Sequence, residues 1–149
     1  MYVRDLMQRE VATLDASDRL DLADDIMRLG RIRHLPILSG GRLVGILSQR
    51  DLFRAAVSSV LQLARPAERE WLGAVPIAAV MTPNVFTVGP ETSVRRAVAI
   101  MIDRKIGCLP VVDRGELVGL VSETDCLGYL AHVLDIAGEK ELLPELHTS

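Results

Sequence analysis

The chain has 149 residues, of which 49% are hydrophobic and 25% are charged, a composition typical of a globular protein and not of a disordered one. Its formal net charge of −3 offers no basic surface for phosphate backbones, which disfavours a nucleic-acid partner. The charged N-terminus, the lack of an apolar stretch of membrane-spanning length and two isolated cysteines predict a cytoplasmic protein without a membrane partner.

Residues 1–56 predict a β-α-β-β-α unit. The first helix carries apolar residues at helical spacing, and Ser17 or Asp18 precedes it as a candidate N-cap. Two strands follow, joined by a Ser-Gly-Gly turn that suits a tight hairpin. The predicted elements are a strand ending at Thr13, a helix ending at Gly30, strands at 34–38 and 42–47, and a helix beginning after Ser48.

Residues 57–75 predict a helical linker, broken at Arg65-Pro66 because proline disrupts a helix interior. Residues 76–132 predict the same five elements again, and residues 133–149 form a polar tail. The second set is a strand ending at Thr87, a helix capped by Thr92 or Ser93, strands at 108–112 and 116–121, and a helix beginning after Ser122.

The two sets of elements form an internal repeat. LVGILSQRDL at 43–52 corresponds to LVGLVSETDC at 117–126, an offset of 74 residues, and the two halves align without a gap. Identical pairs include Thr13/Thr87, Met27/Met101, Pro36/Pro110, Gly45/Gly119, Ser48/Ser122 and Asp51/Asp125. A unit of about 50 residues buries too little surface to be comfortably stable alone. We therefore expect an α+β fold in which the two units pack as one module with pseudo-twofold symmetry.

The repeated pattern resembles the CBS domain, the family named after cystathionine β-synthase. The resemblance lies in an apolar strand with Gly, two apolar residues, Ser, two variable residues and Asp, and it covers about residues 3–56 and 76–131. It implies a CBS pair with two clefts, a regulatory adenosine-containing ligand (AMP, ADP, ATP or S-adenosylmethionine), no other cofactor, and a homodimer that signals to a partner protein. The sequence contains no enzyme motif and no metal-ligand constellation, so we expect neither catalysis nor a metal site.

The resemblance also implies that each cleft combines residues of both repeats. Asp51 or Asp125 would accept hydrogen bonds from both ribose hydroxyls, and the Ser at the helix start would meet a phosphate. The first cleft would combine Thr13, Arg33, His34 and Pro36 with Ser122, Thr124 and Asp125. The second would combine Thr87, Gly107, Cys108 and Pro110 with Ser48, Arg50 and Asp51. The edges that meet adenine would come from Val11–Thr13 and Val85–Thr87.

The two implied clefts differ in charge. Arg33 and His34 stand in the first cleft where Gly107 and Cys108 stand in the second. We therefore expect a phosphorylated ligand in the first cleft, which contains Asp125.

Two other interpretations remain open. The Ser-x-x-Asp spacing at Ser48 and Ser122 also fits a helix capping box, which needs no ligand. The repeat could then be a structural dimerisation module with degenerate pockets, and the loss of polar residues at Gly107-Cys108 favours this alternative. A nucleic-acid binder is the least favoured, because the chain is acidic and poor in aromatic residues.

Overall fold

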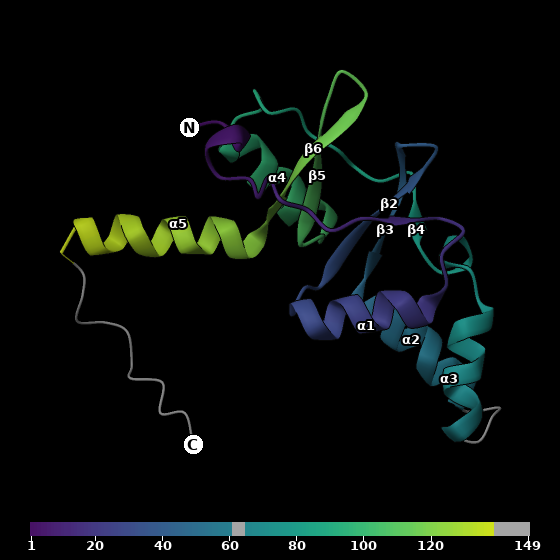
Figure 1. Ribbon diagram of the computed structural model, residues 1–149. Coiled ribbons are helices and arrows are strands. Elements are labelled where there is room, and N and C mark those ends of the chain that lie inside the picture. Colours follow the sequence, from purple (N-terminus) through teal and green to yellow (C-terminus); the bar gives the residue numbers. More distant parts are fainter. Residues whose placement is uncertain (61–64, 139–149) are drawn as a thin grey trace.

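The computed structural model of the chain describes residues 1–60 and 65–138 (Figure 1). The first elements are the 3-10 turn η1 (Val3–Asp5), β1 (Leu14–Asp15), α1 (Leu20–Gly30), β2 (His34–Ser39), β3 (Arg42–Ser48), α2 (Gln49–Val60) and α3 (Arg65–Ala74). They are followed by η2 (Ile77–Ala79), β4 (Thr82–Pro83), α4 (Val94–Arg104), β5 (Cys108–Asp113), β6 (Glu116–Ser122) and α5 (Glu123–Ile136). The α+β fold class is confirmed, and each of the four hairpin strands ends one residue later than predicted.

The short strand that opens each repeat begins later than predicted. β1 pairs in parallel with β2, so Thr13 precedes the strand instead of ending it. In the second repeat Val88 forms a single parallel bridge to β5, and Thr87 again lies just before it. Leu14 and Val88 are buried whereas both threonines are exposed, so burial of the apolar residue decides where pairing starts.

The predicted N-cap of α1 is wrong. Arg19 holds the N-cap position and accepts no side-chain hydrogen bond from the helix. The polar residues before it bond to one another instead: the Asp18 carboxylate accepts from the Asp15 N–H at 2.8 Å, and the Asp15 carboxylate accepts from the Ser17 hydroxyl at 2.7 Å. In α4 the predicted cap is confirmed, because the Ser93 hydroxyl accepts a backbone N–H of the first turn at 3.1 Å.

The linker contains the end of α2 and the helix α3, and the tail is more helical than predicted. The expected break at Arg65-Pro66 coincides with the start of α3, whose first turn tolerates a proline because its N–H groups have no partner within the helix. Residues 61–64 lie outside the described residues. α5 continues to Ile136, into the stretch predicted as a tail, and residues 139–149 again lie outside the described residues.

The two hairpins share one register. Each turn contains two residues with positive φ, the geometry of a type I′ turn, which matches the twist of the flanking strands. The turn pairs Ser39 with Arg42, and a register shift between Ile37 and Leu38 then sets His34 opposite Ser48. The second hairpin has the same shift, so Cys108 lies opposite Ser122. The turn residues are Gly40-Gly41 and Arg114-Gly115.

Each repeat completes its sheet and core with the N-terminal segment of the other repeat. β4, in the N-terminal segment of the second repeat, pairs with β3 of the first. Gln8 exchanges backbone hydrogen bonds with Leu120 of β6, at 2.8 and 2.9 Å. Val3 is fully buried beside α4 and the β5–β6 hairpin, where Figure 1 shows the N-terminus, and Ile77 is fully buried in the core under α1 and α2. Each packing unit therefore combines residues from both halves of the chain.

The described side chains form two apolar cores, one for each repeat. They contain no aromatic residue among their fully or nearly buried members. The first core comprises Leu14, Leu20, Ala23, Met27, Leu35, Ile37, Leu47, Leu52, Leu72 and Ile77. The second comprises Val3, Met7, Val88, Ala97, Met101, Leu109, Val111 and Val121.

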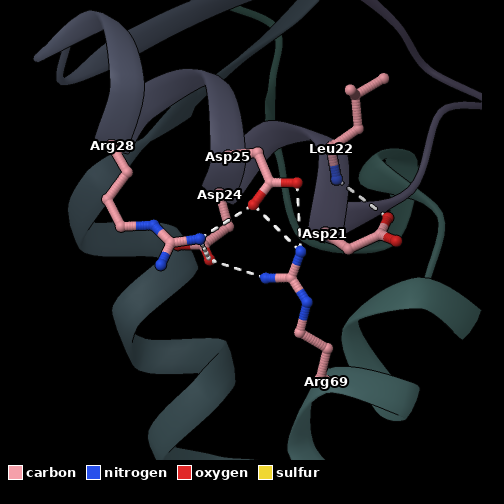
Figure 2. A network of polar contacts seen from close by, with 6 residues as sticks. All are labelled: Asp21, Leu22, Asp24, Asp25, Arg28 and Arg69. Carbon is pink, nitrogen blue, oxygen red and sulfur yellow. Dashed lines mark hydrogen bonds and ion pairs between the residues drawn. The ribbon is translucent and has the colours of Figure 1, made fainter.

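α3 packs against α1 and α2 and adds Leu72 to the first core. At the edge of this contact, Nη2 of Arg69 lies 3.1 Å from both carboxylate oxygens of Asp25, and Nη2 of Arg28 lies 2.8 Å from Oδ1 of Asp25 (Figure 2). The hydrogen bond from Arg69, with a smaller contribution from Arg28, lowers the pKa of Asp25. Exposed ion pairs are weak, so burial of Leu72 contributes more to holding α3 than this cluster does.

Candidate functional site

Both predicted helix starts are capping boxes. In the first repeat the Asp51 N–H donates to the Ser48 hydroxyl at 3.0 Å, and Oδ2 of Asp51 accepts the Ser48 N–H at 3.0 Å. In the second repeat the Asp125 N–H donates to the Ser122 hydroxyl at 3.2 Å, and Oδ2 of Asp125 accepts the Ser122 N–H at 2.9 Å. The capping interpretation is therefore correct at both sites. It leaves ligand binding open, because each carboxylate has a second oxygen.

A large cleft lies beside the first of these helix starts. Its volume is about 1220 Å³, and its lining joins the start of α2, the segment between β4 and α4, the end of α4 and the start of α5. We call it the Asp51 cleft. Its polar lining residues include Arg33, His34, Ser48, Gln49, Arg50, Asp51, Arg54, Thr82, Asn84, Lys105 and Glu123. Its other lining residues are Ile46, Phe53, Val85, Phe86, Val98, Met101, Ile102, Ile106, Gly107, Cys108, Cys126 and Leu127.

The Asp51 cleft has an excess of basic side chains. Four of its lining residues are basic, and all four are exposed to solvent at the cleft: Arg33, Arg50, Arg54 and Lys105. Against them stand two carboxylates, Asp51 and Glu123. The cleft can therefore attract an anionic group even though the whole chain is acidic.

His34 lies half-buried in this cleft. Burial lowers its pKa, and Arg33 acts in the same direction, while the nearby Glu123 and Asp51 oppose the shift. The imidazole is therefore mostly neutral at physiological pH, where it can donate one hydrogen bond and accept another.

The two cysteines line the apolar wall of the cleft. Burial raises the pKa of Cys108 to about 12, and it also raises the pKa of Cys126. Both side chains therefore remain neutral thiols, which are poor nucleophiles and pack as small apolar groups.

The structure groups the predicted site residues differently from the sequence. Five residues predicted for the second cleft do line the Asp51 cleft: Ser48, Arg50, Asp51, Gly107 and Cys108. Arg33 and His34, which the sequence places with Asp125, also line it, because the hairpin register sets His34 opposite Ser48. The preference for a phosphorylated ligand at Asp125 rested on Arg33 and His34, so this preference loses its basis.

The remaining predicted residues lie elsewhere. Thr87 is exposed, one residue beyond the lining residue Phe86, and Pro36 and Pro110 are fully buried in the strands. Thr13 lines a smaller pocket of about 330 Å³, together with Arg9, Val11, Leu38, Gly41, Glu116, Leu117, Val118 and Gly119. Ser122, Thr124 and Asp125 line neither of these two pockets.

Sequence reasoning missed part of the cleft wall. Phe53, Arg54 and Leu127 lie one helical turn inside α2 and α5, and Lys105 lies at the end of α4. The helix periodicity gave a signal for the first three, because Phe53 and Arg54 fall three and four residues after the predicted Arg50, and Leu127 falls three residues after the predicted Thr124. Lys105 could not be found locally, since the fold brings the end of α4 to the cleft.

The carboxylates of Asp51 and Asp125 differ in how many hydrogen bonds their oxygens accept. Oδ1 of Asp51 accepts no hydrogen bond from any residue in the described part of the chain. Oδ1 of Asp125 accepts a hydrogen bond from Nε2 of Gln8 at 3.0 Å, while its Oδ2 also accepts the Ser122 hydroxyl at 3.0 Å. Asp51 is therefore the carboxylate with an oxygen available to a ligand.

The match to known families agrees with this architecture. The model of the CBS domain family matches residues 3–58 and 77–132, the two repeats. The chain belongs to the CBS-domain family. The two halves are thus CBS repeats, and the Asp51 cleft lies between them.

Relatives with CBS repeats include proteins of similar length and much longer enzymes. A CBS domain-containing protein of Dictyostelium discoideum is 31% identical and is matched over 91% of this chain and 94% of its own. The inosine-5'-monophosphate dehydrogenase of Korarchaeum cryptofilum is 36% identical over 78% of this chain, which spans only 22% of that enzyme. A CBS pair of this type therefore occurs both nearly by itself and as a minor part of an enzyme.

Solved CBS pairs have the same fold. A putative acetoin utilization protein (AcuB) from Vibrio cholerae is 34% identical, with a TM-score of 0.76 over 95% of this chain and 98% of its own. The CBS domain pair of protein MJ0100, solved in complex with 5-methylthioadenosine and S-adenosyl-L-methionine, is 25% identical, with a TM-score of 0.76 over 89% of this chain and 98% of its own. The fold and its pairing of two repeats are thus those of known CBS pairs.

The described residues contain neither a metal-binding cluster nor a membrane-spanning helix. In residues 1–60 and 65–138, no group of three or more His, Cys, Asp or Glu side chains could hold a metal ion. Within the same ranges, no helix is both long and apolar enough to cross a membrane.

Proposed function

We propose that this CBS pair is a regulatory module that binds an adenosine-containing ligand in the Asp51 cleft. The observation that carries the proposal is that Oδ1 of Asp51, which accepts no hydrogen bond among the described residues, belongs to a cleft lined by four basic side chains. A ribose offers two adjacent hydroxyl donors, and a charged carboxylate is the acceptor that binds them best. The complex of the MJ0100 CBS pair with two adenosine compounds supports the same ligand class.

Different lining residues of the cleft suit different parts of a nucleotide. Asp51 would accept the ribose hydroxyls, and Arg33 and Arg50 would pair with phosphate or another anionic group. Val85 and Phe86 would supply the apolar edge for adenine. A ligand held in this way contacts α2 of the first repeat and the segment between β4 and α4 of the second, so it would favour one relative arrangement of the two repeats.

The proposed output of that shift is a signal to another protein in the cytoplasm, without catalysis by the CBS pair itself. We also propose that the module acts as a homodimer, with α5 at the interface. α5 has no buried side chain in the described structure and carries exposed leucines along one face. A second candidate function follows from the same observations: a dimerisation module without a ligand, which the completed capping boxes favour.

A ligand screen distinguishes the two candidates. The purified chain is heated with adenosine, AMP, ADP, ATP, 5'-methylthioadenosine, S-adenosylmethionine or GTP at millimolar concentration. A ligand that binds only the folded state raises the melting temperature, so we expect one or more adenosine compounds to raise it and GTP to leave it unchanged. If none of the seven compounds changes the melting temperature, the structural module becomes the better proposal.

Asp51→Asn then tests the site. Removing a hydrogen-bonded carboxylate is expected to cost about 1.5–3 kcal/mol of binding free energy, or about tenfold to a hundredfold in Kd, measured by calorimetry. Asp135→Asn removes an equal charge from an exposed position on α5, outside the cleft, and serves as the matched control. An unchanged Kd in Asp51→Asn would show that the ligand does not use this carboxylate.

A further inference from the structure

Among the described residues, the contact from Gln8 distinguishes the Oδ1 of Asp125 from the Oδ1 of Asp51. Nε2 of Gln8 donates to Oδ1 of Asp125 at 3.0 Å, across 117 positions of sequence. This oxygen corresponds to the Oδ1 of Asp51 that accepts nothing in the described residues. Gln8 thus occupies, with a side chain of the same molecule, the acceptor that a ribose would need in the second repeat.

The internal repeat shows which residue takes the place of Gln8 beside the other Asp. At an offset of 74 residues the counterpart of Gln8 is Thr82, in β4. Both residues pair with equivalent positions, Gln8 with Leu120 and Thr82 with Ile46, so their backbones occupy the same place in each sheet. Thr82 makes no hydrogen bond to Asp51 in the described structure, since its side chain is too short, and it lines the open cleft. The difference between the two sites is therefore a difference of one side chain's length and chemistry.

Residues near the two Asp side chains also make the second repeat less favourable for an anionic ligand. Arg50 and Arg54, which line the Asp51 cleft, correspond to Thr124 and Gly128 in the second repeat. The Asp125 side thus lacks two of the cations that would attract an anionic ligand. Asp125 meets a neutral amide donor instead, which satisfies the carboxylate without adding charge.

We propose that Gln8 is an internal plug of the Asp125 site and that the chain consequently binds one adenosine-containing ligand, in the Asp51 cleft. The inference rests on the proposed function and adds its stoichiometry and the residue that sets it. A ligand at Asp125 must first displace the Gln8 amide. Breaking a hydrogen bond to a charged group is expected to lower the affinity for that ligand about tenfold to a hundredfold.

Exchanging the two residues tests the plug. AMP, ATP and S-adenosylmethionine are titrated separately into the wild-type chain, Gln8→Thr and Thr82→Gln in a calorimeter. We expect one ligand per wild-type chain and two per Gln8→Thr chain, because the exchange gives the second repeat the residue of the first. Thr82→Gln is expected to weaken binding about tenfold to a hundredfold by placing the same plug beside Asp51. The double variant Gln8→Thr with Asp125→Asn should return the stoichiometry to one.

The outcomes separate the plug from the proposed function. One ligand per chain in both the wild type and Gln8→Thr, or two in the wild type, overturns the plug while the ligand-binding function stands. No binding of any of the three compounds to wild type, Gln8→Thr or Thr82→Gln overturns both. Because Gln8 is exposed, Gln8→Thr should fold, and the unfolding curve of each variant without ligand checks this. If Gln8→Thr nevertheless unfolds, Thr82→Gln decides: unchanged affinity there also overturns the plug.

Discussion

Gly45 in β3 and Gly119 in β6 occupy equivalent places where a segment from the other half of the chain passes very close. A Cβ on Gly45 would lie 2.9 Å from the carbonyl oxygen of Thr82, and a Cβ on Gly119 would lie 2.7 Å from that of Gln8. Both contacts involve backbone atoms, which cannot turn aside as the end of a side chain can. The glycine of the repeated motif is therefore needed for the segment exchange, independently of any ligand.

We predict that Gly45→Ala lowers the free energy of unfolding by about 1–3 kcal/mol, the usual cost of overpacking. Gly128→Ala is the matched control, because nothing lies within 4 Å of its added Cβ and it sits inside α5. Alanine has the better helix propensity, so this control should raise stability by about 0.5–1 kcal/mol. Urea unfolding of the two variants measures both values. Equal stability of Gly45→Ala and wild type would contradict the close approach.

At the scale of elements, the last helices of the two repeats have different surroundings. α2 contacts α1 and α3 and places Leu52 in the first core. α5 projects from the β5–β6 hairpin, with no helix in the place that α3 occupies beside α2 (Figure 1), among the described residues. Leu127, Leu130 and Leu134 are 62%, 50% and 38% exposed and fall on one face of α5. An apolar face of this kind is what a helix buries against a partner.

The proposed dimer through α5 predicts the effect of a charge on that face. Light scattering should give the wild-type chain a mass near twice 16.3 kDa. Leu130→Lys should give a single chain mass, because a buried ammonium without a partner opposes association. His132→Lys adds a charge two residues further along, on the opposite side of the helix, and should leave the dimer intact. A dimeric Leu130→Lys would place the interface elsewhere.

At the scale of the whole molecule, the two halves of the chain are held together because each contributes a segment to the core or sheet of the other. Residues 1–8 supply Val3 and Met7 to the second core, and residues 75–83 supply Ile77 and β4 to the first repeat. A cut between the repeats therefore leaves each half without part of its core, although each retains its own hairpin and helices. The two marginal halves become one cooperative unit because neither can bury its apolar surface alone.

This arrangement predicts the behaviour of the separate halves. Fragments 1–74 and 75–149 should each lack a cooperative melting transition in circular dichroism. Mixed together, they should regain one, because each supplies the segment that the other lacks. Val3→Asp in fragment 1–74 should abolish this recovery, since it would place a carboxylate in a fully buried apolar position. A half that melts cooperatively by itself would show that the exchanged segments are dispensable.

The sequence alone determined the features that depend on neighbours along the chain. The hairpin turns, the hairpin strands to within one residue and the helix starts at Ser48 and Ser122 follow from turn chemistry, alternation and capping, which act over a few residues. The repeat also identified Asp51 and Asp125 as equivalent, because the offset of 74 is a property of the sequence itself.

Only the tertiary structure decided which of these two equivalent carboxylates has an oxygen available to a ligand. Whether Gln8 reaches Asp125 depends on the N-terminal segment crossing to the second repeat, and the burial of Val3 and Met7 drives that crossing. The gathering of Arg33, Arg50 and Lys105 around one cleft depends likewise on how three helices and a hairpin pack. Local patterns do not encode such distances, because burial of apolar surface is non-directional and its partners are selected by the whole fold.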